Sequence, residues 1–200
     1  HRPCGWAGGP ADVNKEGVPF RWRGPILLKP DGGGLGRFNN KQAIALVAEA
    51  IAIWKNVSSA NIPPITLQEA FEVDITSENV DTFLLSNDGI TPIIFDNDGS
   101  IINRSCPGTD PTCRGRVLGL AVAKVLVDDP REGPTIKEGA IILNGLFFND
   151  VLGDASADLP GDALVKTVVH ELGHLLGLDH SQLNSSSYFS STYEHDLNVT

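Results

Sequence analysis

The segment His170-Glu-Leu-Gly-His-Leu-Leu-Gly-Leu-Asp-His180 carries histidines and a glutamate at spacings that suit metal chemistry. On a helix, His170 and His174 project from one face because they are four residues apart, and Glu171 lies beside that face. Gly177 can take the left-handed conformation that ends a helix, and the returning chain would deliver His180. Three neutral imidazoles leave the fourth position of a zinc ion open for water, as in catalytic zinc sites.

These residues predict a hydrolase. Zinc held by the three histidines would lower the pKa of a bound water to about 7 and polarise a substrate carbonyl. Glu171 would take the proton from that water and hand it to a leaving amine. We therefore expect a zinc-dependent endopeptidase that acts on proteins or peptides. One alternative is a non-catalytic zinc-containing module that binds peptides, although such a module has no chemical need for Glu171. A zinc hydrolase acting on a non-peptide amide shares the same site.

The segment that leads into the histidines has the pattern of an amphipathic helix. At about 100° per residue, its apolar side chains fall on one broad arc and the two helical histidines point to the opposite side. We expect the helix to bury the apolar arc and to present the histidines to a cleft. The residues of the arc are Leu164, Val165, Val168, Val169, Leu172, Leu175 and Leu176.

Other elements must support this helix. Asn39 can cap a helix with Gln42 completing a capping box, and apolar residues recur at helical spacing as far as Trp54, which predicts a helix packed on a sheet. Short β-rich runs at 65–71, 82–85, 92–95, 117–127 and 140–143 predict strands, so the expected fold class is mixed α/β, or α+β. The strand with Gly119, Leu120 and Ala121 is a candidate sheet edge to which an extended peptide could add. An ordinary interior strand is the alternative.

Composition limits the class of protein. The 200 residues include 15 basic and 25 acidic side chains, a net charge of −10 that repels nucleic-acid backbones, and 41% hydrophobic residues. The apolar runs are shorter than the roughly 20 residues that a membrane-spanning helix needs. We expect a monomer, with residues 1–17 as a leader or linker and residues 18–200 as one catalytic domain.

Two further features bear on the compartment and on metals. Cys106 and Cys113 bracket a turn-rich loop whose ends could meet in a disulfide, which would favour a secreted, extracellular protein; two unpaired thiols in a cytosolic loop are the alternative. The run Asp96-Asn-Asp-Gly-Ser100 resembles a calcium loop, but Ile94 stands where the EF-hand pattern needs a carboxylate. A tight turn is the first prediction there, and Ca²⁺ is retained as an alternative.

The segment HELGHLLGLDHS, His170 to Ser181, resembles the zinc signature of the metzincin metallopeptidases, and the serine after the third histidine resembles the matrixin branch. Weaker likenesses to secreted bacterial matrixin-like proteins lie at 52–57 and 140–145. The resemblance implies a twisted mixed sheet with a long N-terminal helix, an active-site helix and a substrate-binding edge strand. It also implies a zinc endopeptidase cleft between a large upper and a small lower subdomain.

The sequence departs from this family in two places. The family has a methionine turn after the third histidine, whereas this chain has no methionine and continues for 20 residues beyond His180. We therefore expect the lower subdomain to be incomplete, with an altered turn as the alternative. Arg2-Pro-Cys-Gly resembles the matrixin propeptide switch, so Cys4 is a candidate thiolate for the open zinc position; an unpaired leader cysteine is the alternative.

Overall fold

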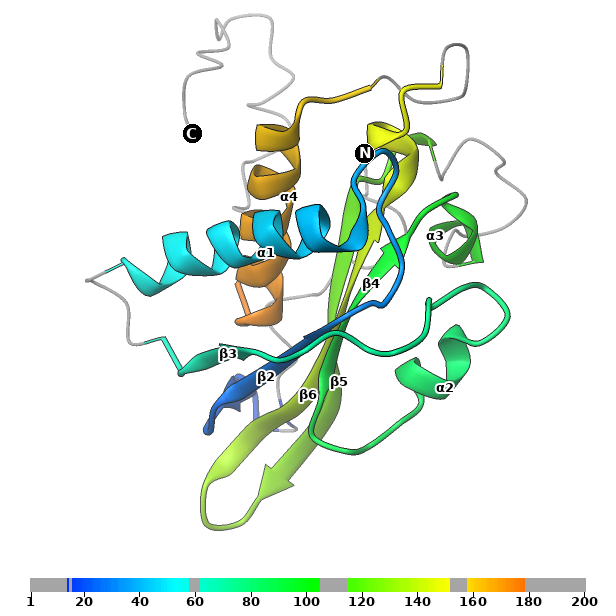
Figure 1. The fold of residues 1–200 in the computed structure, drawn as a ribbon. Coiled ribbons are helices and arrows are strands. Elements are labelled where there is room, and N and C mark those ends of the chain that lie inside the picture. Colours follow the sequence, from blue (N-terminus) through cyan, green and yellow to red (C-terminus); the bar gives the residue numbers. More distant parts are fainter. Residues whose placement is uncertain (1–13, 15, 58–61, 105–114, 152–157, 179–200) are drawn as a thin grey trace, which may run out of the picture.

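The computed structural model describes residues 14, 16–57, 62–104, 115–151 and 158–178 (Figure 1). The described chain forms a mixed α/β fold with a mostly parallel sheet, which agrees with the expected fold class. The strands are β1 (Arg21–Trp22), β2 (Ile26–Pro30), β3 (Ile65–Leu67), β4 (Thr91–Asp96), β5 (Gly119–Asp129) and β6 (Gly133–Asn144). The helices are α1 (Asn40–Lys55), α2 (Val80–Leu84), α3 (Ser100–Arg104), the 3-10 turn η2 (Gly145–Phe148) and α4 (Gly161–Leu175).

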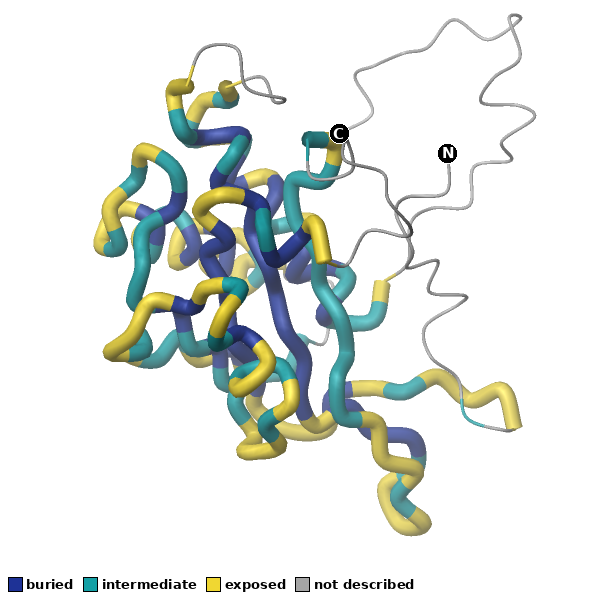
Figure 2. The backbone as a smooth tube through the Cα atoms, turned by 90° about the vertical axis from the view of Figure 1, so that its right-hand side faces the viewer, coloured by how far each residue is buried: buried dark blue, intermediate teal, exposed yellow. Residues whose placement is uncertain are grey.

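Strand β6 organises the sheet. It pairs in parallel with β1 and with β4, β4 pairs with β2, and β2 pairs with β3. On its other side β6 pairs with β5 in a long antiparallel hairpin that runs from Gly119 opposite Leu143 to Asp129 opposite Gly133. Among the described strands β5 pairs with β6 alone, so it forms an edge of the sheet. Figure 2 shows the difference in burial, since most of β6 is buried and β5 is half-buried or exposed.

The predicted capping box begins helix α1. The side chain of Asn39 accepts a hydrogen bond from the backbone N–H of Gln42 at 3.0 Å, and the side chain of Gln42 accepts one from the backbone N–H of Asn39 at 3.0 Å. These two bonds satisfy amides that a helix N-terminus otherwise leaves unpaired. The prediction of a capped helix is confirmed, and α1 packs with α4 on one side of the sheet (Figure 1).

Apolar side chains are buried on both faces of the sheet. Neighbouring residues of one strand point to opposite faces, because side chains alternate along a strand. Ile93 and Phe95 of β4 belong to the large core beneath α1 and α4, whereas Ile94 belongs to a smaller cluster on the opposite face. The smaller cluster also contains Ile75, Val80, Ile101, Ile102 and Ile142. The main core therefore lies between the sheet and the two long helices, directly behind the apolar arc of α4.

Some boundaries differ from the sequence predictions. The predicted strand at 82–85 is wrong, because Val80–Leu84 is helix α2. A short apolar run has no reliable period, and here Val80 packs into the smaller cluster from a helix. Strand β3 covers only the start of the predicted run at 65–71, and β6 extends well beyond 140–143. Within the described residues, no helix is both long and apolar enough to cross a bilayer.

Candidate active site

Helix α4 brings His170 and His174 together as the spacing predicts. Their Nε2 atoms lie 3.0 Å apart, and the two rings are nearly perpendicular with centroids 4.6 Å apart. Zinc binds imidazole nitrogen at about 2.0–2.1 Å, so two such ligands must lie within about 4 Å of each other. The spacing of the two Nε2 atoms fits a shared zinc ion. His170 is exposed and His174 is half-buried, so the pair faces outward from the helix.

The end of α4 orients one of these rings. Gly177 has φ 95°, its N–H donates to the carbonyl of His174 at 2.9 Å, and the N–H of Leu178 donates to the carbonyl of Gly173 at 3.0 Å. This pair of bonds is a Schellman motif, which confirms the predicted role of Gly177. The carbonyl of Leu178 lies 2.8 Å from Nδ1 of His174. Because a carbonyl can only accept, Nδ1 carries the proton, and Nε2 keeps its lone pair for a metal.

Two tryptophans fasten α4 from separate elements. The indole N–H of Trp54 in α1 donates to the carbonyl of Val169 at 2.8 Å, and that of Trp22 in β1 donates to the carbonyl of Leu175 at 2.6 Å. These carbonyls stand at either end of the segment that carries the two histidines. Gly173 faces the ring of Trp54, where an added Cβ would lie 3.4 Å from the nearest ring atom. The Trp54 ring therefore packs directly against α4 at this point.

Glu171 is buried, with 5% of its surface exposed. Burial disfavours the charged carboxylate and raises its pKa from 4.5 to about 7. The side chain lies against the beginning of β5, because a Cβ added at Gly119 would be 3.0 Å from Cγ and 3.2 Å from Oε1 of Glu171. The edge strand and the glutamate are therefore neighbours, although 52 positions separate them in the sequence. A carboxyl group with a pKa near neutrality can both accept and release a proton.

The described chain brings together only part of the predicted site. Gly119, Leu120 and Ala121 lie on the edge strand β5, beside the helix that carries Glu171. The third predicted ligand, His180, lies outside the described residues. The same holds for Cys4, Cys106 and Cys113. In the part of the chain that the structure describes, no three His, Cys, Asp or Glu side chains are grouped to hold a metal.

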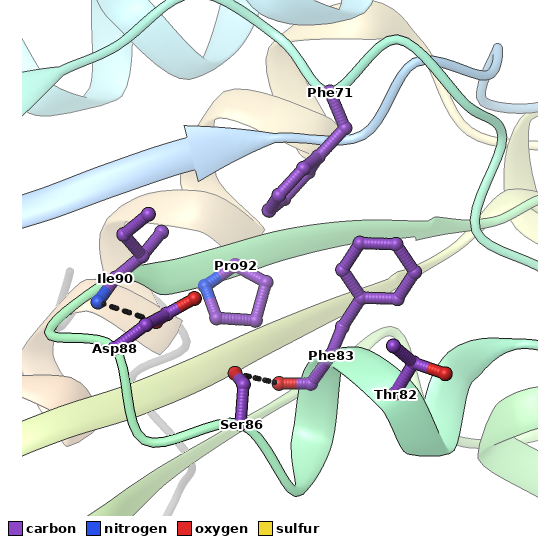
Figure 3. A pocket seen from close by; sticks show the side chains of 7 residues that line it. All are labelled: Phe71, Thr82, Phe83, Ser86, Asp88, Ile90 and Pro92. Atoms are coloured by element: carbon purple, nitrogen blue, oxygen red, sulfur yellow. Dashed lines mark hydrogen bonds between the residues drawn. The ribbon is translucent and has the colours of Figure 1, made fainter.

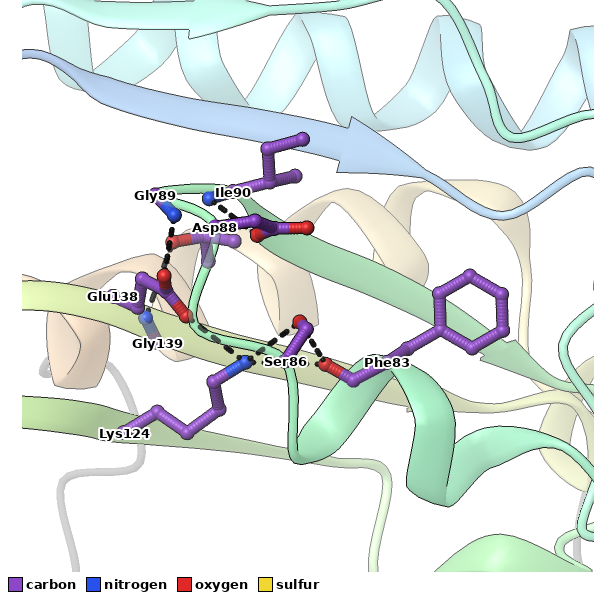
Figure 4. A network of polar contacts seen from close by, with 9 residues as sticks. Phe83, Ser86, Asp88, Gly89, Ile90, Lys124, Glu138 and Gly139 are labelled. Carbon is purple, nitrogen blue, oxygen red and sulfur yellow. Dashed lines mark hydrogen bonds and ion pairs between the residues drawn. The ribbon is translucent and has the colours of Figure 1, made fainter.

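Sequence reasoning missed a buried polar network that holds the middle of β5 (Figure 4). Lys124 Nζ lies 3.1 Å from Glu138 Oε2 and donates to the carbonyl of Phe83 at 3.1 Å, while Glu138 Oε1 accepts from the N–H of Gly89. Lys124 is an extra residue in β5, since Ala123 faces Gly139 and Val125 faces Glu138. The sequence shows Lys124 and Glu138 as charged residues within strand-forming runs, but it does not show that they face each other.

A small pocket of about 190 Å³ lies beside this network (Figure 3). Its lining comes from α2, from the loop that joins α2 to β4, and from the start of β4, with Phe71 closing one side. None of the lining residues belongs to α4 or β5. The pocket is therefore separate from the histidine pair. The lining residues are Phe71, Thr82, Phe83, Ser86, Asp88, Ile90 and Pro92.

Comparisons of the chain with protein-family models, with curated proteins and with solved structures gave no match.

Proposed function

We propose that this chain is a zinc-dependent endopeptidase of the metzincin type, in which Glu171 is the general base. The observation that carries the proposal is the combination on one helix of a paired histidine face with a buried glutamate. His170 and His174 have Nε2 atoms 3.0 Å apart, and His180 follows His174 by six residues in the sequence. Zinc, when bound there, would lower the pKa of a water molecule and polarise a substrate carbonyl.

The burial of Glu171 supports catalysis over simple peptide binding. A buried carboxylate without a compensating partner destabilises a fold, and among the described residues this side chain has no hydrogen bond or ion pair. A metal site that only stabilises the protein or binds a peptide has no need for such a group. A general base beside the metal does need it, because a pKa near 7 suits proton transfer at neutral pH.

The edge strand supports a peptide as the substrate. Alternate residues of β5 direct their backbone N–H and C=O groups away from β6, so an extended chain can add to this edge by main-chain hydrogen bonds. At Gly119 the same edge meets the Glu171 carboxyl group. A peptide paired along 119–121 would therefore pass close to the proposed base. We propose this edge as the substrate-binding strand of a secreted enzyme.

The test compares the wild-type chain with Glu171→Gln and with Glu132→Gln as a matched control. Glu132 is an exposed residue of the β5–β6 turn region and pairs with Lys137 at 3.6 Å, far along the hairpin from Gly119. Zinc content and hydrolysis of denatured casein are measured on all three proteins. Loss of a general base lowers the rate by about 10²- to 10⁴-fold.

We expect stoichiometric zinc in every protein and loss of cleavage only in Glu171→Gln. Zinc in all three without cleavage by any would contradict the endopeptidase and favour the peptide-binding module. If wild type binds no zinc, or if Glu171→Gln cleaves as well as wild type, the assigned site is wrong. His174→Ala provides a second check, because it removes a predicted ligand and should abolish zinc binding.

A further inference from the structure

The outward-facing backbone groups of the edge strand β5 follow a regular pattern only as far as Ala123. The N–H of Asn144 in β6 donates to the carbonyl of Leu118 at 2.9 Å, and the pairs with β6 then continue at a constant register from Gly119 to Ala123. Hydrogen-bonded and non-hydrogen-bonded pairs alternate along an antiparallel ladder. Counted from Leu118, the residues that direct their N–H and C=O groups away from β6 are Gly119, Ala121 and Ala123.

Lys124 interrupts this pattern. It is an extra residue opposite β6, and the register shifts on both sides of the next residue, Val125. A bulge bends its strand and increases the twist, and one extra residue also reverses the alternation of inward and outward groups. A regular extended peptide that pairs with Ala123 would need matching irregularities to stay paired beyond Lys124. The bulge therefore ends the regular edge, as bulges do at the edges of other sheets.

The contacts of the Lys124 side chain hold the bulge in place. Its Nζ lies 3.1 Å from Oε2 of Glu138, donates to the carbonyl of Phe83 at 3.1 Å and donates to Oγ of Ser86 at 3.5 Å (Figure 4). An ammonium group has three N–H donors, so these partners use all of them. Straightening β5 would break the contacts and leave the buried carboxylate of Glu138 without its counter-charge, which strongly destabilises a fold. The interruption is therefore a fixed feature of the strand.

The two parts of β5 also have different surroundings. Residues 119–125 are half-buried, and residues 126–128 are exposed. In the first part, Ala121 and Ala123 pack against the main core, and Gly119 lies against the side chain of Glu171. Only the part before Lys124 therefore combines regular outward-facing groups with a position beside the proposed general base.

We propose that Lys124 sets the length of the peptide-binding edge, so that an extended substrate forms main-chain hydrogen bonds with Gly119, Ala121 and Ala123 and with no residue of β5 beyond Lys124. The presence of a peptide at this edge rests on the proposed function. Each outward-facing residue has one N–H and one C=O group, so the edge offers about six main-chain hydrogen bonds. Backbone recognition along β5 is thereby limited to a stretch of about five substrate residues.

The first measurement follows peptide binding and not cleavage, so that it can fail separately from the proposed peptidase. Overlapping casein peptides, each as long as the 11 residues of β5, are titrated into the zinc-loaded full chain with Glu171→Gln. Exchange of individual backbone N–H groups is then measured by NMR with and without the peptide that binds most tightly. We expect the peptide to slow exchange at Gly119, Ala121 and Ala123 and to leave residues 125–129 unchanged.

Two substitutions at one position test the hydrogen bond next to the bulge. Ala123→Pro removes the outward-facing N–H, and proline is tolerated on an edge strand where that group faces solvent. Ala123→Val adds a side chain of similar size and keeps the N–H, so it is the matched control for crowding. We expect Ala123→Pro to bind the peptide about three- to tenfold more weakly than Ala123→Val, the usual net effect of one hydrogen bond. Melting temperatures show whether both variants are folded.

Three results would overturn the proposal. They are slowed exchange beyond Lys124, equal binding by the two folded Ala123 variants, and binding of none of the peptides. If Ala123→Pro does not fold, the exchange pattern alone decides. Cleavage of the same peptide by the wild-type chain is measured separately. A peptide that binds with the expected exchange pattern but is not cleaved would contradict the peptidase and leave the length of the edge confirmed.

Discussion

Two buried glutamates lie at the β5–β6 hairpin, Glu138 within β6 and Glu171 of α4 against Gly119, and their surroundings differ. Glu138, which is fully buried, faces the ammonium group of Lys124 at 3.1 Å and accepts from the N–H of Gly89 (Figure 4). Glu171, at 5% exposure, lies against Gly119 and has neither kind of partner among the described residues. A buried charge with partners holds elements together, whereas a buried carboxylate without them remains available for proton transfer.

This difference divides β5 into two parts. The extra residue Lys124 joins the middle of the strand to Phe83 of α2 and to Ser86 just after that helix. The part from Gly119 to Ala123 pairs regularly with β6 and runs beside α4. The fastened part can therefore hold the open part in place against Glu171.

The largest expected effect is a loss of stability in the variant Glu138→Gln. The substitution keeps an acceptor for Gly89 but leaves the ammonium group of Lys124 buried without its counter-charge. Breaking a buried pair in this way lowers the free energy of unfolding by about 3–5 kcal/mol. Urea denaturation measures the loss, and Lys124→Met in the same chain should recover most of it. If Glu138→Gln unfolds at the wild-type midpoint, the pair does not fasten β5.

Gly119→Ala should reduce activity with little loss of stability. An added Cβ would meet Cγ of Glu171 at 3.0 Å, so the glutamate must shift by a few tenths of an ångström. We expect kcat/KM on a peptide substrate to fall about tenfold, which corresponds to about 1.4 kcal/mol, mainly through kcat. A parallel melting experiment is the control. A fall in melting temperature large enough to explain the activity loss would contradict a positioning effect.

The smallest expected effect is the change in stability from Glu171→Gln, measured on zinc-free protein. Because burial raises the pKa of Glu171 from 4.5 to about 7, wild type loses stability as the pH rises through that range. The variant lacks this loss, so it should equal wild type below pH 4.5 and be at least as stable at pH 8. Urea midpoints at the two pH values test the sign. If the variant is less stable than wild type at pH 8, the charged Glu171 stabilises the fold as Glu138 does, and the two glutamates do not differ in this respect.

The sequence by itself determined those features that depend only on residues close together in the chain. The capping box at Asn39 and Gln42, the amphipathic pattern of α4 and the stop at Gly177 each involve bonds or periodicities within one or two turns of helix. The same holds for the approach of His170 to His174, since a spacing of four residues places two side chains on one helical face. These features were predicted correctly because few other residues can change them.

Tertiary structure decided the features that join distant segments. The burial of Glu171 depends on β5, the Trp54 bond to Val169 spans 115 positions, and the Lys124 bond to Phe83 spans 41. Residues 82–85 have a strand-like composition, yet they lie in or next to helix α2. This helix packs Val80 into the smaller cluster. A sequence lists residue types without stating which ones share a neighbourhood. Burial, and with it the chemical state of an acid, is therefore settled only by the folded chain.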